Sequence, residues 1–286
     1  YILIKKIYAS MALDQEQDHS EDKEMSFFDH LETLRKHLFR SAVSVALFTI
    51  VGFVYIEYIF DQVILGPLKN DFISYRLLCD LSHYLYGNDQ FCIKNLNIVL
   101  LNLEMSGQFM ISFRLAFLTG IILSMPYLVW QLWKFLRPAL TLKERSKTRG
   151  FTFYTTFLFL TGVCFGYFVL CPISINFLSN YTLSSMIENK YTVSSIVSFL
   201  SLIVLGTGLI FELPIVMYFL ARIGIISSEF LKKYRKHSFV VILIVAAIAT
   251  PPDVVSQITL TVPLYSLFEL GIVIIKRVEK QKAEHV

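Results

Sequence analysis

The sequence predicts an all-α membrane protein with six transmembrane helices, and three observations lead to this prediction. Of the 286 residues, 55% are hydrophobic and only 17% are charged, whereas a soluble domain is about 25% charged. The apolar residues gather in six runs, as is typical of a polytopic membrane protein. Lys and Arg gather in alternate connections between the runs, so the net charge of +4 reflects membrane topology and does not indicate nucleic-acid binding.

The six runs differ in length. They lie at about 39–60, 109–136, 151–172, 193–221, 239–250 and 254–275. The fifth, FVVILIVAAIAT, would reach only about 18 Å as a helix, against a hydrocarbon core of about 30 Å. Polar residues and Pro263 interrupt the sixth, and the tight turn ATPPD joins the two. We therefore predict short fifth and sixth spans, around which the bilayer thins or neighbouring helices shield the turn.

The basic residues indicate the orientation. They cluster before the first run and at 137–149, 222–236 and 276–282, whereas 173–192 carries only Lys190 and 251–253 carries none. Because basic loops stay in the cytoplasm, both termini should be cytoplasmic. Residues 1–24 should be a disordered or non-native extension, with Met25 a candidate natural start. The membrane domain should then span 25–277, and 278–286 should form a cytoplasmic tail.

The first outer connection, 61–108, is long and contains Pro67 and the amphipathic stretch FISYRLLCDLSHYLY. It also contains Cys79 and Cys92, which either form a disulfide in the oxidising exterior or remain free thiols. No Walker A, HExxH, GxSxG or CxxC motif occurs, and the six histidines are scattered. The sequence therefore indicates neither an enzyme nor a metal site.

Three acidic residues stand out as candidates for function. Glu32 lies near Arg35 in FFDHLETLRKHLFR and either pairs within an interfacial helix or forms part of a site. Glu144 is the only acid among five basic residues and either pairs in water or receives a cationic ligand. Glu212 lies ten residues, about 15 Å, from Arg222, near the membrane midplane. A carboxylate there must be protonated, paired or exposed to a water-filled concavity, as a helix tie, a docking point or a proton site.

Several motifs occur in the order found in the TatC family, the polytopic subunit of the twin-arginine protein translocase. They are FFDHLETLRKHL, GPL at 66–68, SMPYLVWQLWKFLRPALTLKERS, FELPIVMYFLARIGI, LKKYRKHSFVV and ATPPDVVSQITLTVPLYSLFELGI. The chain resembles this family from about Met25 to Arg277. The resemblance implies a cup-shaped bundle of six spans in the bacterial inner membrane, without a cofactor. It also implies a receptor for signal peptides with two consecutive arginines, which assembles with single-span TatA- or TatB-type subunits into an oligomer and exports folded proteins using the proton-motive force.

The resemblance also assigns roles to individual residues. The acid of the first cytoplasmic loop corresponds to Glu144, and carboxylates suit the arginine pair because guanidinium binds them bidentately. The family pattern HLxELR reads HLETLR here, so Thr33 holds the expected glutamate position and Glu32 lies one residue earlier, about 100° around a helix. The expected signal-peptide site comprises Glu144, Arg145, Glu32, Arg35 and Phe135.

Other matches lie within or beside the membrane. The resemblance implies a partner-docking or intramembrane polar role for Glu212 and Gln257. It implies structural roles for Pro67, Pro251, Pro252 and Asp253. One alternative is a proton-coupled secondary transporter using Glu212, which would require an inverted repeat that the sequence lacks. A membrane enzyme using Glu212 as an acid or base would need a nucleophile or metal cluster nearby.

Overall fold

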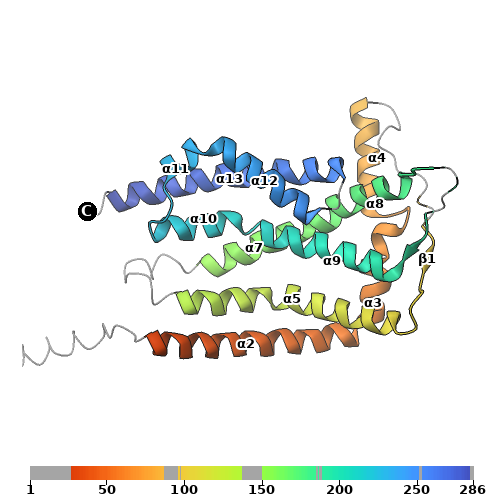
Figure 1. The fold of residues 1–286 in the computed structure, drawn as a ribbon, viewed down its shortest axis with the longest axis horizontal. Helices are drawn as coiled ribbons and strands as arrows, with labels where there is room; N and C mark the ends of the chain where they lie inside the picture. Colours follow the sequence, from red (N-terminus) through yellow and green to blue (C-terminus); the bar gives the residue numbers. More distant parts are fainter. Residues whose placement is uncertain are drawn as a thin grey trace, which may run out of the picture.

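The computed structural model describes residues 27–86, 96, 98–136, 150–184, 186, 189–250 and 253–283. Its helices run side by side along one axis and form an elongated bundle (Figure 1). Helices α2 (Phe27–Val54) and α5 (Gly107–Leu136) pack together along one side. The start of α2 and the end of α13 (Val254–Ala283) lie at the same end, here called the terminal end.

Five helical segments among the described residues are long and apolar enough to cross a membrane. They are Leu31–Val54, Gly107–Phe135, Phe151–Asn180, Val193–Arg222 and Val254–Lys280. Helix α12 (Arg235–Ala249) has 15 residues, a length of about 22 Å, and falls below that size. The chain is therefore an all-α membrane protein, and α12 is the short element that the sequence predicted at 239–250.

The predicted short sixth span is wrong, because α13 is a continuous helix of 30 residues. Pro263 lies within it, and neighbouring helices can compensate for the backbone donor that a proline removes. The helix continues through the basic residues to Ala283, so the predicted tail from 278 begins as helix. Residues 1–26 lie outside the described residues.

The third and fourth spans are less regular than the sequence predicted. The third consists of α7 (Phe151–Phe165), the π-helical η4 (Gly166–Leu170) and α8 (Cys171–Asn180). The fourth, predicted as one run, is divided into α9 (Val193–Ile210) and α10 (Leu213–Arg222). The break arises because Pro214 has no N–H to donate to the preceding turn.

The opposite end of the bundle is here called the distal end. It carries the connection from α2 to α5 and the connection that leads to α9. After α2 follow α3 (Ile56–Tyr58), the π-helical η1 (Ile59–Ile64) and the 3-10 helix η2 (Gly66–Leu68). The predicted amphipathic stretch forms α4 (Ile73–Tyr86), which stands across the bundle axis (Figure 1). Two short strands that the sequence did not reveal, β1 (Leu100–Leu101) and β2 (Tyr191–Thr192), pair in parallel and join the two distal connections.

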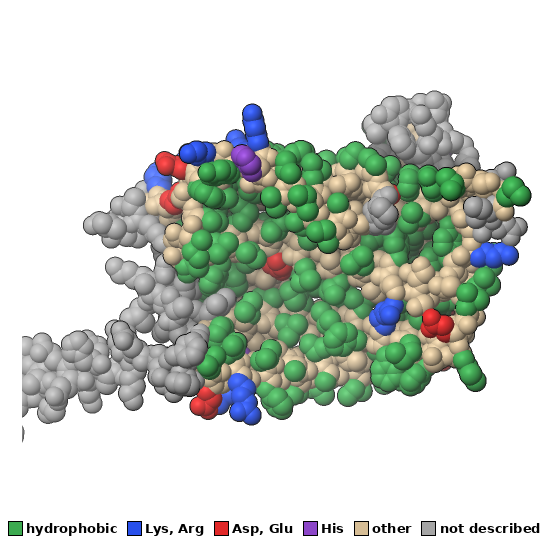
Figure 2. All heavy atoms as spheres, viewed as in Figure 1, with side chains coloured by type: hydrophobic (Ala, Val, Ile, Leu, Met, Phe, Trp, Pro, Cys, Tyr) green, Lys and Arg blue, Asp and Glu red, His purple; other side chains and the backbone are tan. Residues whose placement is uncertain are grey.

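Charge is distributed as expected for a protein in a bilayer. Hydrophobic side chains cover most of the middle of the visible face, while charged side chains gather mainly toward its two ends (Figure 2). At the terminal end, α11 (Ser228–Lys233) is attached to α13, because Glu279 accepts hydrogen bonds from the backbone N–H and the hydroxyl of Ser228. Arg235 and Glu269 form an ion pair of 2.6 Å between α12 and α13.

The packing of α7 against α9 depends on Gly162. A Cβ atom there would lie 2.8 Å from the Cβ of Phe211 and from the carbonyl oxygen of Thr207, and 2.9 Å from the Cα of Gly208. Two of these three atoms belong to the backbone and cannot rotate away. We expect Gly162→Ala to lower the free energy of unfolding by about 1–3 kcal/mol.

Gly206 supplies the matched control, because its Cβ would meet nothing closer than the Cβ of Ala249 at 3.9 Å. Gly206→Ala should raise the helix stability by about 0.5–1 kcal/mol. Thermal unfolding of both variants in the same detergent tests the pair. Equal stability of the two variants would contradict the close α7–α9 approach.

Candidate functional site

Glu32 is exposed on the first turns of α2 at the terminal end. Its carboxylate pairs with Lys36 at 2.7 Å, and the two side chains are 63% and 64% exposed. Arg35 is also exposed, whereas Thr33, at the position expected to hold glutamate, is half-buried. An exposed pair of this kind contributes at most about 1 kcal/mol, so Lys36 can readily be exchanged for another cation.

A polar contact joins α2 to α5 beside Glu32. His37 lies 2.6 Å from Oε1 of Gln131, whose Nε2 donates to the hydroxyl of Tyr127 at 2.5 Å. The His37 ring also meets the ring of Phe135 edge-on, with centroids 6.5 Å apart. The contact therefore places Phe135 against α2 at His37, which lies five residues after Glu32 and on a different side of the helix.

Sequence reasoning gave no role to His37 or Gln131. Gln131 is only 2% exposed although it lies in a strongly apolar helix. A lone glutamine in such a helix needs a partner, because unpaired amides are costly in an apolar environment. That signal was present in the sequence, but nothing in it indicated that the partner would be a histidine on α2.

The loop acid of the predicted site cannot be placed. Glu144 and Arg145 lie outside the described residues, as do Pro251 and Pro252. Of the predicted site, the structure describes Glu32 and Arg35 near the start of α2 and Phe135 near the end of α5, and their joint role with the loop stays a prediction.

Glu212 lies at the break between α9 and α10. Its side chain is only 9% exposed, and neither carboxylate oxygen has a hydrogen-bond partner within the described part of the chain. Glu269, by contrast, pairs with Arg235 at 2.6 Å and accepts a hydrogen bond from Tyr265 at 3.1 Å. Glu212 therefore retains unused hydrogen-bonding capacity inside the described part of the bundle.

Asp253 and Gln257 stabilise the α12–α13 hairpin. Asp253 is 2% exposed, and its Oδ1 accepts from the backbone N–H of Ser256 at 2.6 Å, as a helix N-cap does. The Gln257 amide donates to the carbonyl oxygen of Leu243 on α12 at 3.3 Å. Ser256 and Ser174 of α8 lie within 2.5 Å of each other and fasten the hairpin to the third span.

Pro67 shapes the distal end. It is buried in η2, and its carbonyl oxygen accepts a hydrogen bond of 2.7 Å from the hydroxyl of Tyr75 on α4. Tyr167 of η4 donates to the carbonyl of Val63 at 2.7 Å, so one buried and one exposed hydrogen bond hold the η1–η2 turn. Cys79 is disulfide-bonded and Cys92 lies outside the described residues, so their pairing stays a prediction.

The Tyr75 contact makes a testable prediction. Burial raises the pKa of the Tyr75 hydroxyl well above its ordinary value. The folded protein therefore keeps this proton where the unfolded chain begins to lose it, and the corresponding stability is lost as the pH rises above about 10. Tyr75→Phe should lower the free energy of unfolding by about 1 kcal/mol at neutral pH. It should also reduce the further decrease in this free energy as the pH rises above about 10. Denaturant unfolding at pH 7 and pH 11 measures both effects, and an unchanged alkaline loss would contradict the assignment.

No group of three or more His, Cys, Asp or Glu side chains able to hold a metal ion occurs among the described residues. Cys164 and Cys171 are free thiols, the first exposed and the second buried. The side chains described at the terminal end include the carboxylate of Glu32, the amide of Gln131 and the ring of Phe135. These groups recognise cations and helices.

Comparison with known proteins shows the family of the chain. A sequence model described as Sec-independent protein translocase protein (TatC) matches residues 29–263. The chain is 40% identical over 264 residues to the Sec-independent protein translocase protein TatC of Blattabacterium sp. subsp. Periplaneta americana, covering 92% of this chain and 99% of that protein. It is 33% identical over 263 residues to TatC of Carboxydothermus hydrogenoformans, with 92% and 97% covered.

The fold is also similar to that of solved structures. A chain described as "Crystal Structure of Twin Arginine Translocase Receptor- TatC" superposes with a TM-score of 0.63 and 25% identity, over 86% of this chain and 98% of that one. A second such structure, in DDM, gives 0.65 and 26%, over 85% and 97%. The family consists of translocase components and is not one of enzymes. A family model that matches most of the chain, and a relative that is 40% identical over nearly its whole length, show that the chain belongs to the TatC family of Sec-independent protein translocase proteins.

Proposed function

We propose that the chain is the signal-peptide receptor and core scaffold of a twin-arginine translocase, which exports folded proteins across the bacterial inner membrane. One arrangement supports this proposal: the His37–Gln131 contact joins the start of α2, which carries Glu32, to the end of α5, which carries Phe135. An exposed carboxylate and an aromatic ring at the same end of the bundle suit an arginine, which can bond to the first and stack on the second.

Recognition would proceed by exchange of cations. Lys36 is a monodentate, exposed partner of Glu32, whereas an arginine of the signal peptide can form two parallel hydrogen bonds to a carboxylate. Glu144 takes the second arginine in this scheme, with Arg145 and the other basic residues holding its loop near lipid head groups. Arg35 contributes at the edge of the site.

The proposed topology has six spans with both termini in the cytoplasm. The start of α2 and the end of α13 lie at the same end of the bundle (Figure 1), which supports an even number of crossings. Five long spans then require α12 to be the sixth crossing, although it is only 15 residues long. The basic residues at the terminal end support its cytoplasmic location.

Glu212 is the proposed docking point for a single-span TatA- or TatB-type subunit within an oligomeric complex. Both its oxygens are unsatisfied within the described residues, and a partner helix carrying a polar side chain would pair with them. The proton-motive force would drive the export cycle. The alternative function, a proton-coupled transporter, would explain Glu212 alone. The translocase function also explains the candidate residues at the terminal end.

Export of a folded reporter tests the proposal. A reporter fused to a twin-arginine signal is expressed in a strain that lacks its own TatC but has the cognate single-span subunits. We expect the chain to restore export, and we expect export to fail when the two arginines are replaced by lysines. Restored export of the lysine version would count against the recognition site, and no export of either version would overturn the translocase proposal.

A further inference from the structure

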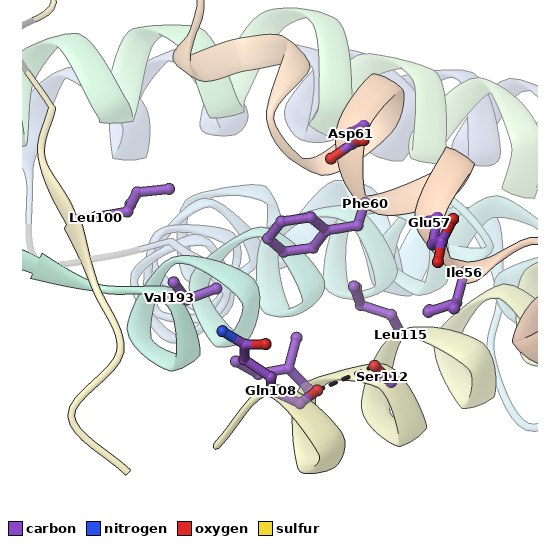
Figure 3. Close-up of a pocket in the computed structure, with 10 residues that line it drawn as sticks. Ile56, Glu57, Phe60, Asp61, Leu100, Gln108, Ser112, Leu115 and Val193 are labelled. Atoms are coloured by element: carbon purple, nitrogen blue, oxygen red, sulfur yellow. Dashed lines mark hydrogen bonds between the residues drawn. The ribbon is translucent and has the colours of Figure 1, made fainter. Parts of the chain in front are cut away.

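A cavity of about 410 Å³ opens at the distal end, between η1, β1 and the first turns of α5 and α9 (Figure 3). Its volume lies within the range of about 300–1,000 Å³ typical of small-molecule sites. It is far from the terminal-end site, so the proposed recognition of signal peptides does not use it. Nothing in the established family membership assigns it a ligand.

The inner part of the cavity is apolar. The ring of Phe60 reaches into its middle, between Leu115 and Val193 (Figure 3). Ile111 and Leu115 are 5% and 1% exposed and form a preformed floor on α5. Such a surface suits a hydrocarbon chain, since burial contributes about 0.8 kcal/mol for each methylene group.

The rim of the cavity carries two acids, Glu57 and Asp61. Both residues are exposed, and neither carboxylate has an ion pair or hydrogen bond within the described residues. Lys69 donates to the backbone carbonyl of Asp61 at 3.2 Å and does not pair with its carboxylate. Arg114, the nearest cation along α5, donates to Ser198 instead. Two negative charges four residues apart thus border one cavity, and no cation among the described residues pairs with either of them.

The position of the cavity relative to the membrane spans accounts for both its apolar inner part and its acidic rim. Glu57 and Asp61 follow directly after the apolar span that ends at Val54, and Ser112 and Leu115 lie in the first turns of the span that begins at Gly107. The cavity therefore crosses the boundary between the hydrocarbon layer and the head groups. The junction between the head group and the acyl chains of a lipid lies at the same depth.

We propose that this cavity binds a membrane lipid whose head group carries a primary ammonium. The ammonium has three N–H donors, which can bond to Glu57 and Asp61 together, while an acyl chain packs on Phe60 and Leu115. Ser112 donates to the carbonyl of Gln108 at 3.0 Å, and the Gln108 side chain remains available for an ester or phosphate oxygen. A trimethylated head group has no N–H donor and loses these bonds, so the site distinguishes the two lipids.

Native mass spectrometry of the purified full chain in detergent tests the proposal. Phosphatidylethanolamine and phosphatidylcholine with identical acyl chains are titrated separately, and the fraction of protein that retains a lipid is measured. We expect phosphatidylethanolamine to bind about tenfold more tightly, since a charge-assisted hydrogen bond corresponds to about that ratio. Free ethanolamine at the same concentration should not compete, because it lacks the acyl chain.

Variants separate this site from general lipid binding. Glu57→Gln combined with Asp61→Asn should remove the tenfold preference, and Phe60→Ala should weaken both lipids alike. Glu104→Gln is the matched control, because Glu104 is an exposed acid at the same end outside the cavity lining, and the preference should persist. Equal binding of the two lipids by the unmodified protein would overturn the proposal even if the double variant failed to fold. A preference kept by a folded double variant, or competition by ethanolamine alone, would also overturn it.

Discussion

Glu144→Gln should weaken binding of a twin-arginine signal peptide by about tenfold to a hundredfold, with little change in the stability of the protein. The substitution keeps the shape of the side chain but removes the charge, and a hydrogen bond between charged groups is worth about 1.5–3 kcal/mol. Glu144 is the only acid in its basic loop, so no neighbouring carboxylate can replace it. Binding of a fluorescent signal peptide to the protein in detergent or nanodiscs measures the effect.

Glu32→Gln is the comparison that makes this result informative. Glu32 is exposed and already paired with Lys36, so the arginine gains less by replacing one partner with another. We expect about a two- to fivefold loss of affinity, in keeping with an exposed ion pair. A larger loss for Glu32 than for Glu144 would assign the main role to the α2 acid. Glu104→Gln, at the distal end, should leave signal-peptide binding unchanged.

Glu212→Leu should raise the free energy of unfolding by about 1–3 kcal/mol while it abolishes association with the single-span partner. A buried carboxylate without partners costs about this much, and leucine removes the cost. If Glu212 is the docking point, the same change removes the group that the partner must meet. Thermal unfolding in detergent and co-purification of a tagged partner subunit provide the two measurements.

Two further variants separate docking from proton transfer and from general packing. Glu212→Gln keeps the hydrogen-bonding shape and should preserve co-purification, so a loss of export with intact docking would indicate a proton role. Glu269→Leu is the paired control, because Glu269 already bonds to Arg235 and Tyr265. It should destabilise the protein, in contrast to Glu212→Leu. Destabilisation by both leucine variants would contradict the unsatisfied state of Glu212.

Much of the fold could be predicted because the bilayer imposes simple rules. Runs of apolar residues indicated the long spans, and the twelve residues after His237 and Ser238 predicted a short fifth helix, which is α12. The length of α13 could not be predicted in this way. Polar residues and Pro263 suggested an interrupted span, but a helix packed against α10 and α12 tolerates them, and its basic end continues as helix outside the apolar region.

The site was predictable in part for a related reason. Glu212 stood out because carboxylates are rare in apolar runs. Exposing a carboxylate to lipid is costly, so the burial of Glu212 inside the bundle could be expected. The break beside it follows from Pro214, but the sequence did not show whether the helix would bend or end there. His37 and Gln131 were missed because their meaning lies in a contact between residues 94 positions apart, which no local pattern contains.

The divided fourth span has a mechanical consequence. Its two halves are fastened to different neighbours, since α9 packs on α7 whereas α10 packs on α13. The joint consists of Phe211 and Glu212, whose φ angles of −66° and −75° are helical but whose ψ angles of −14° and −7° depart from the helical value of about −42°. A small rotation at these two residues would swing one half of the bundle against the other, as at the hinges of many domain motions. The buried carboxylate of Glu212 therefore lies on the pivot between the two halves of the span.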